Sequence, residues 1–172
     1  MDATTRSRLE SFLKPLYQDL DGVSRWDEVE RIERIARAID NRTADALDLL
    51  LLFHGLGRWL DKVGHLSRVT LTAGIDENAL RRTAASIRKL DAPESEDERT
   101  VAAAILIDRS GVRGLAQRFA AARREGHSIV DVVREALADS WVPEWVPQNA
   151  RAMLEDRLEK RRDFCAAVLA EL

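Results

Sequence analysis

Residues 44–60 read ADALDLLLLFHGLGRWL, and five consecutive apolar residues, 49–53, form the centre of this stretch. Apolar residues occupy nearly every side of a helix drawn through it, which is typical of a central helix that packs against several neighbours. We therefore predict one helix over residues 44–60 with Gly55 inside it, where an aspartate should be tolerated unless a neighbour packs against the missing side chain. His54 follows Leu51, Leu50 and Leu47 by three, four and seven residues, so its imidazole is predicted on an apolar side.

Outward from this helix, apolar residues recur at spacings of three and four in both directions, the pattern of amphipathic helices. No stretch shows the two-residue alternation of a half-buried strand. The pattern predicts an all-α fold, a bundle of about seven to nine helices. The repeats cover residues 9–20, 29–39, 65–73, 76–87, 98–108, 115–124, 129–137 and 148–172.

A length of 172 residues suits a single domain. Within a domain over residues 1–172, we expect an N-terminal helix at 1–22 and a core at 24–140 that carries the motifs described below. A loop at 141–147 and a final helix at 148–172 complete it.

The charge and the cysteine content restrict the partners and the location. Basic residues number 27 and acidic residues 30, and the net charge of −3 gives no general attraction to nucleic acid or to an anionic membrane. The apolar stretch 49–53 is too short to cross a bilayer. Cys165 is the only cysteine, and its apolar neighbours predict a core residue. We expect a cytoplasmic protein, because a chain without disulfides suits a reducing compartment.

Two tryptophans stand between prolines in the stretch WVPEWVP at residues 141–147. We predict that Trp141 and Trp145 bury most of their surface over the bundle, in which case Trp→Ala at either position should cost about 3–5 kcal/mol. If both rings were exposed side by side, the loop would instead be a candidate protein interface.

Three ionisable residues fall where the periodicity predicts apolar faces: Glu28, His54 and Asp108. A buried charge is costly unless it is paired, protonated or bound to a metal, so each of them needs a partner. Either each is a hydrogen-bonded structural residue, or the three converge in one site. Convergence predicts that their side chains approach within about 12 Å, roughly twice the range over which charges shift each other's pKa.

The motifs around these residues resemble those of the HD-domain family. Residues 26–32, WDEVERI, resemble its first signature helix, and 51–59, LLFHGLGRW, resemble the His-Asp segment that names the family. Residues 107–109, IDR, resemble the later helix whose aspartate is the last ligand, and the stretch 111–124 resembles its continuation. The resemblance runs in order from about residue 24 to the end of the chain. It implies an HD-like helical bundle.

In that family the ligands hold one or two divalent metal ions that activate water for phosphohydrolysis. The resemblance implies a possible Mn, Fe, Co, Ni or Mg ion. His54 and Asp108 match the motif, whereas Glu28 replaces the first histidine and Gly55 replaces the aspartate of the pair. Leu90 stands where many members have a further histidine. The ligands left to such an ion are Glu28, His54 and Asp108, with His65 as an auxiliary.

Arg58 and Arg109 follow His54 and Asp108 closely in the sequence. They could grip a phosphate with two parallel hydrogen bonds. Equally, they could neutralise Glu28 and Asp108 through salt bridges, which would make the site structural.

Two functions are therefore open. The first is a non-catalytic binding or regulatory protein, a pseudoenzyme whose partner is a small phosphate-containing ligand or another protein; Gly55 and Leu90 favour it. The second is a divergent metal-dependent phosphohydrolase that acts on a nucleotide or small phosphate ester. The placement of Glu28, His54 and Asp108 on apolar faces favours the second.

Overall fold

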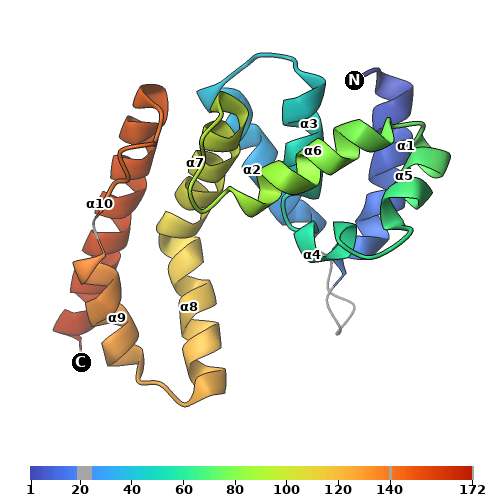
Figure 1. Ribbon diagram of the computed structural model, residues 1–172. Helices are drawn as coiled ribbons and strands as arrows, with labels where there is room; N and C mark the ends of the chain where they lie inside the picture. Colours follow the sequence, from blue (N-terminus) through green and yellow to red (C-terminus); the bar gives the residue numbers. More distant parts are fainter. Residues whose placement is uncertain (19–24, 140, 172) are drawn as a thin grey trace. The chain divides into compact units, whose positions relative to one another are not determined.

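The computed structural model describes residues 1–18, 25–139 and 141–171 (Figure 1). These residues form ten α-helices and one 3₁₀ helix, so the predicted all-α fold is confirmed. The part of the predicted N-terminal helix at 19–22 lies outside the described residues. The elements are α1 (Ala3–Leu13), η1 (Lys14–Tyr17), α2 (Trp26–Ile39), α3 (Asp45–Phe53), α4 (Gly57–Leu60), α5 (His65–Ala73), α6 (Glu77–Arg88), α7 (Glu96–Ser110), α8 (Val112–Glu125), α9 (Ile129–Ala138) and α10 (Gln148–Ala170).

The chain divides into two compact units, Met1–Ala102 and Ala103–Leu172, with the boundary inside α7. Each unit has a hydrophobic core of its own. The single domain expected over 1–172 stays a prediction. Within the described ranges, every helix is either too short or too polar to span a bilayer.

The first unit is built around α3, which packs against α2 and α6, while α1 packs against α5. All seven residues of α3 from Leu47 to Phe53 are buried, as the apolar pattern predicts. Removing these side chains from water contributes to the driving force for assembling the unit. Its core comprises Leu9, Leu13, Tyr17, Trp26, Val29, Leu49, Leu52, Phe53, Leu56, Leu60, Val69, Ala73, Ile75, Leu80 and Ala84.

The helix predicted over residues 44–60 is wrong in its second half. The α-helix ends at Phe53, a turn follows at His54 and Gly55, and the single-turn helix α4 begins at Gly57. The apolar periodicity of the sequence continues through the turn, so it gives no sign that the helix ends at Phe53. The contacts that cause the break belong to the candidate site described below.

A capping box starts α7, with Ser95 before the helix and Glu98 in its first turn. The Glu98 carboxylate accepts hydrogen bonds from the backbone N–H groups of Glu94 and Ser95, both at 3.0 Å, and the Ser95 hydroxyl accepts one from the Glu98 N–H at 3.2 Å. This reciprocal arrangement satisfies N–H groups that have no partner inside the helix.

The second unit contains α8, α9 and α10, each of which packs against the other two. Its core includes Cys165, which is fully buried, so the predicted core role is confirmed. Gly126 ends α8 in the left-handed region with φ of 76°, as its position after the last apolar repeat predicts. Gly114 allows the start of α8 to lie close to the backbone of Arg109 in α7, because a Cβ at position 114 would be 1.7 Å from the Arg109 carbonyl oxygen.

The loop at 141–147 corrects one prediction about the tryptophans. Trp141 is 73% exposed, whereas Trp145 is half-buried. Pro143 and Val146 face the interior instead. Arg151 holds the loop by donating a hydrogen bond to the carbonyl of Glu144 at 3.0 Å. The prolines fix which residues of the loop turn inward, and Trp141 is not among them.

We expect Trp141→Ala to change the free energy of unfolding by less than about 0.5 kcal/mol, because the ring loses little burial. Trp145→Ala should cost more, up to about 3 kcal/mol, because this ring is mostly covered. Chemical denaturation followed by far-ultraviolet circular dichroism measures both. Equal losses at the two positions would contradict the assignment of Trp145 as the covered ring.

The capping box of α7 makes a pH-dependent contribution to stability. Burial acts to raise the pKa of Glu98, but hydrogen bonds from the backbone of Ser95 and Glu94 and from the Ser86 side chain outweigh it and hold the pKa below its ordinary value of 4.5. The lowered pKa means that the contribution is complete above pH 4.5 and is lost as the pH falls through the folded-state pKa.

Glu98→Gln should therefore destabilise the protein by about 1 kcal/mol at pH 7. The difference between the two proteins should shrink as the pH falls through the folded-state pKa of Glu98, because the wild-type side chain then also becomes neutral. Urea denaturation at several pH values tests this. A difference that is constant with pH would show that the charge of Glu98 contributes nothing.

Candidate functional site

The residues singled out by the sequence are distributed over both units. Glu28 lies on α2, His54 directly follows α3 and His65 begins α5, all in the first unit. Asp108 and Arg109 lie on α7 within the second unit. Glu28, His54 and Asp108 are each half-buried rather than fully buried. The approach of Asp108 to the other two stays a prediction.

The end of α3 shows what His54 does locally. The last carbonyls of a helix have no partner within it. Here the His54 Nδ1 lies 2.7 Å from the carbonyl oxygen of Leu51, and the Tyr17 hydroxyl donates to the carbonyl oxygen of Leu52 at 2.8 Å. Two side chains thus cap the helix. Because a carbonyl only accepts, Nδ1 carries the proton, and in the neutral ring the lone pair is on Nε2.

Tyr17 also explains why Gly55 is not in a helix. The Gly55 N–H donates to the Tyr17 hydroxyl at 3.3 Å, in place of a carbonyl of the helix. A Cβ at Gly55 would lie only 2.8 Å from Cε1 of Tyr17. The ring is 8% exposed and belongs to the core. A neighbour therefore packs against position 55, and an aspartate there would collide with a buried, hydrogen-bonded ring.

Tyr17 is the side chain around which the predicted residues of the first unit gather. Its ring lies 6.3 Å from the His54 ring and 5.7 Å from the Trp26 ring, measured between centroids. Burial raises the pKa of the Tyr17 hydroxyl, and the negative charge of Glu28 acts in the same direction. The structure thus brings Glu28 and His54 to the neighbourhood of one neutral phenol.

His65, the predicted auxiliary ligand, has a packing role. Its Nδ1 lies 2.8 Å from the carbonyl oxygen of Trp59, and its ring lies 4.2 Å from the Trp59 ring. Trp59 in turn meets Phe12 edge-on at 5.9 Å. These contacts hold the start of α5 against α4 and α1.

Arg58 and Arg109 are both exposed. Within the described part of the chain, neither forms an ion pair, so the salt bridges considered for them with Glu28 and Asp108 are not formed there. Their guanidinium groups are open to solvent.

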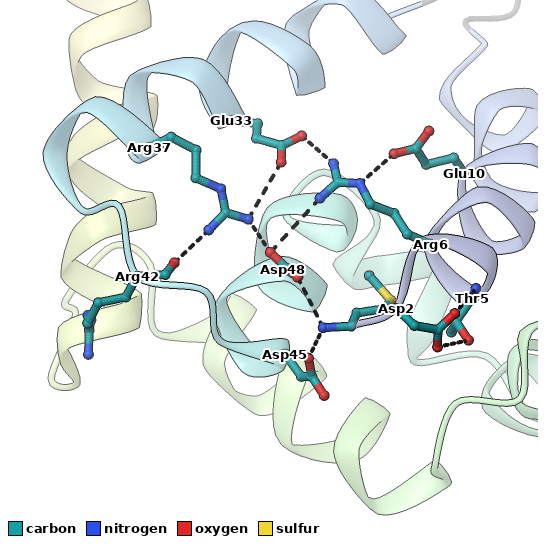
Figure 2. A network of polar contacts seen from close by, with 10 residues as sticks. Asp2, Thr5, Arg6, Glu10, Glu33, Arg37, Arg42, Asp45 and Asp48 are labelled. Carbon is teal, nitrogen blue, oxygen red and sulfur yellow. Dashed lines mark hydrogen bonds and ion pairs between the residues drawn. The ribbon is translucent and has the colours of Figure 1, made fainter.

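A buried charge that the sequence analysis missed lies in the middle of α3. Asp48 is 7% exposed and forms an ion pair with Arg37. Arg6 lies 4.0 Å from the same carboxylate and also reaches Glu33 at 2.6 Å and Glu10 at 2.8 Å (Figure 2). The network ties α1, α2 and α3 together. The signal in the sequence is an acid between Leu47 and Leu49, at the start of the apolar run.

A hollow of about 480 Å³ opens beside this network on α2, lined by Glu30, Glu33, Arg34 and Arg37. Two acids and two bases leave its lining without net charge. Glu33 and Arg37 are already engaged in the network. The hollow lacks the excess positive charge that a phosphate group requires.

Position 55 offers no side-chain ligand to a metal ion, because it is a glycine. Among the described residues, no group of three or more His, Cys, Asp or Glu side chains is placed to hold a metal. The carboxylate that the HD motif places after the histidine is missing at Gly55, and Tyr17 occupies the space. Whether Glu28, His54 and Asp108 together hold the metal that the resemblance implies stays a prediction, because Asp108 belongs to the second unit.

No family model, curated protein or solved structure matches this chain. The likeness to the HD-domain family therefore depends on the motifs at residues 26–32, 51–59 and 107–109.

Gly55→Ala isolates the contact with Tyr17, because the φ of Gly55 is not in the left-handed region and an alanine is otherwise allowed. We expect it to destabilise the protein by about 1–3 kcal/mol, since overpacking forces a well-packed ring to move. The measurement is the free energy of unfolding in urea.

The matched control is Gly55→Ala in proteins that also carry Tyr17→Phe or Tyr17→Leu. With Tyr17→Phe the ring carbon that meets the new Cβ remains, so the loss of stability should persist. With Tyr17→Leu the loss of stability should fall, giving a coupling energy of about 1 kcal/mol or more in a double-mutant cycle. Equal costs in all three backgrounds would exclude Tyr17 as the reason for glycine.

Proposed function

We propose that this protein is a non-catalytic binding or regulatory protein that keeps an HD-like arrangement of helices. The observation that carries the proposal is the contact between Tyr17 and Gly55. The second residue of the His-Asp pair has no side chain here, and the ring of Tyr17 lies 2.8 Å from where its Cβ would be. The position is committed to packing instead of to a ligand.

Ligand count supports the same proposal. Structural and catalytic metal sites generally use at least three protein ligands. Near Tyr17 the chain offers the imidazole of His54 and the carboxylate of Glu28. The tyrosine hydroxyl cannot readily become a third ligand, because burial raises its pKa and it donates to the Leu52 carbonyl.

The proposed partner is a small phosphate-containing molecule or another protein. Arg58 supports this part of the proposal, since its exposed guanidinium forms no ion pair with the described residues. A guanidinium can donate two parallel hydrogen bonds to a phosphate or a carboxylate.

A divergent phosphohydrolase is the alternative, and one observation favours it. His54 holds its Nδ1 proton on a backbone carbonyl, which is how metal-binding histidines are commonly oriented. Glu28 is close enough for its charge to act on the same tyrosine that contacts His54. The two hypotheses differ in metal affinity and in hydrolysis.

We expect the purified protein to contain no stoichiometric metal and to hydrolyse neither nucleotides nor generic phosphate esters with added manganese, nickel, cobalt or magnesium. Mass spectrometry measures the metal content, and calorimetric titration measures the metal affinity. The release of phosphate measures hydrolysis. His54→Ala, Asp108→Ala and a control at the exposed His127 are compared with the wild type.

Tight metal binding that is lost in His54→Ala and Asp108→Ala but kept in His127→Ala would overturn the proposal in favour of the hydrolase. Restoring the motif with Glu28→His and Gly55→Asp is not expected to create a site by itself. The aspartate first has to displace Tyr17, so the double variant should lose stability instead.

A further inference from the structure

A separate group of charged residues lies in the second unit, where α8, α9 and α10 meet at Asp139. Arg118 of α8 reaches Asp139 Oδ2 at 2.8 Å, and Arg161 of α10 reaches the same oxygen at 3.5 Å. Arg161 also donates to the carbonyl oxygen of Asp139, the residue that caps the end of α9. Two guanidinium groups therefore converge on one carboxylate oxygen.

Among the described residues the charges in this group do not balance, because two arginines share one acid. Arg161 is only 1% exposed, and its buried Nε has no hydrogen-bond partner among the described residues. Burial lowers the pKa of Arg161, with Asp139 opposing this change and Arg118 adding to it. A buried guanidinium with an unused donor and an excess of positive charge is costly, and an anion would offset the excess charge.

Solvent reaches the outer half of the group, since the side chains of Arg118 and Asp139 are 43% and 48% exposed. An oxygen placed beside Asp139 Oδ2 would be within reach of both arginines, because both already contact that atom. The carboxylate of Asp139 is the internal competitor for this position.

We propose that Arg118 and Arg161 form a binding site for a small oxyanion of the phosphate or sulfate type at the junction of α8, α9 and α10. The anion enters from the side of Arg118, takes hydrogen bonds from both guanidinium groups and partly displaces the Asp139 carboxylate. Guanidinium groups bind tetrahedral oxyanions through paired hydrogen bonds, and two of them hold one anion more tightly than either alone. This inference is independent of the function proposed above.

Inorganic phosphate is the probe, titrated against chloride at constant ionic strength and followed by thermal unfolding and calorimetry. We expect a saturable rise in Tm with phosphate, because a ligand that binds only the folded state stabilises it by mass action. Arg118→Gln should weaken the affinity at least about tenfold, since it removes a charge-assisted hydrogen bond. Arg134→Gln is the matched control, an exposed arginine on α9 with the same change of charge.

Asp139→Asn should change the phosphate affinity in the opposite direction. It tests directly whether the Asp139 carboxylate competes with phosphate for the two arginines. Without the carboxylate charge, phosphate should bind more tightly than in the wild type. The proposal is overturned if phosphate and chloride stabilise the wild type equally, if Arg118→Gln behaves like Arg134→Gln, or if Asp139→Asn fails to tighten binding. A phosphorylated small molecule that binds at least tenfold more tightly than inorganic phosphate would identify the phosphoryl group as part of a larger ligand.

Discussion

The hydroxyl of Tyr17 bonded to the end of α3 is the contact on which the rest of the first unit depends. It accepts a hydrogen bond from the N–H of Gly55 and donates one to the carbonyl of Leu52. The hydroxyl thus takes the place of the backbone partners that these two groups would have in a continued helix. The buried helix stops at Phe53 for this reason, and the chain can turn into α4. A ring at this place also requires glycine at position 55.

The same turn bears on the proposed function, because it contains position 55, where the HD motif has its aspartate. His54 donates its Nδ1 proton to the Leu51 carbonyl, and the ring of Tyr17 lies against the place where a side chain at position 55 would be. Polar groups next to a hydrophobic core are here satisfied by the protein itself. The network around Asp48 follows the same principle, since its buried carboxylate is neutralised by Arg37 and Arg6 (Figure 2).

The buried charge of the second unit, Arg161, is satisfied less completely than Asp48 in the first. Arg161 donates to the Asp139 carbonyl at the end of α9, yet its Nε has no partner among the described residues and a second arginine shares the same acid. In the first unit the acids and bases around Asp48 satisfy one another, whereas here positive charge is in excess. An unbalanced, partly accessible charge is a better basis for recognition than a balanced and closed one.

The sequence by itself determined the all-helical class, the buried centre of α3, the burial of Cys165 and the glycine end of α8, because each depends on residues within a few positions of one another. It also showed that Glu28 and His54 lie on or near apolar faces. Only the tertiary structure decided that the helix stops at Phe53, since the cause, Tyr17, lies more than thirty residues away in the chain. The exposure of Trp141 and the burial of Asp48 and Arg161 were also decided at that level. Periodicity identifies which face of a helix is apolar, but which partner reaches that face depends on contacts between distant segments.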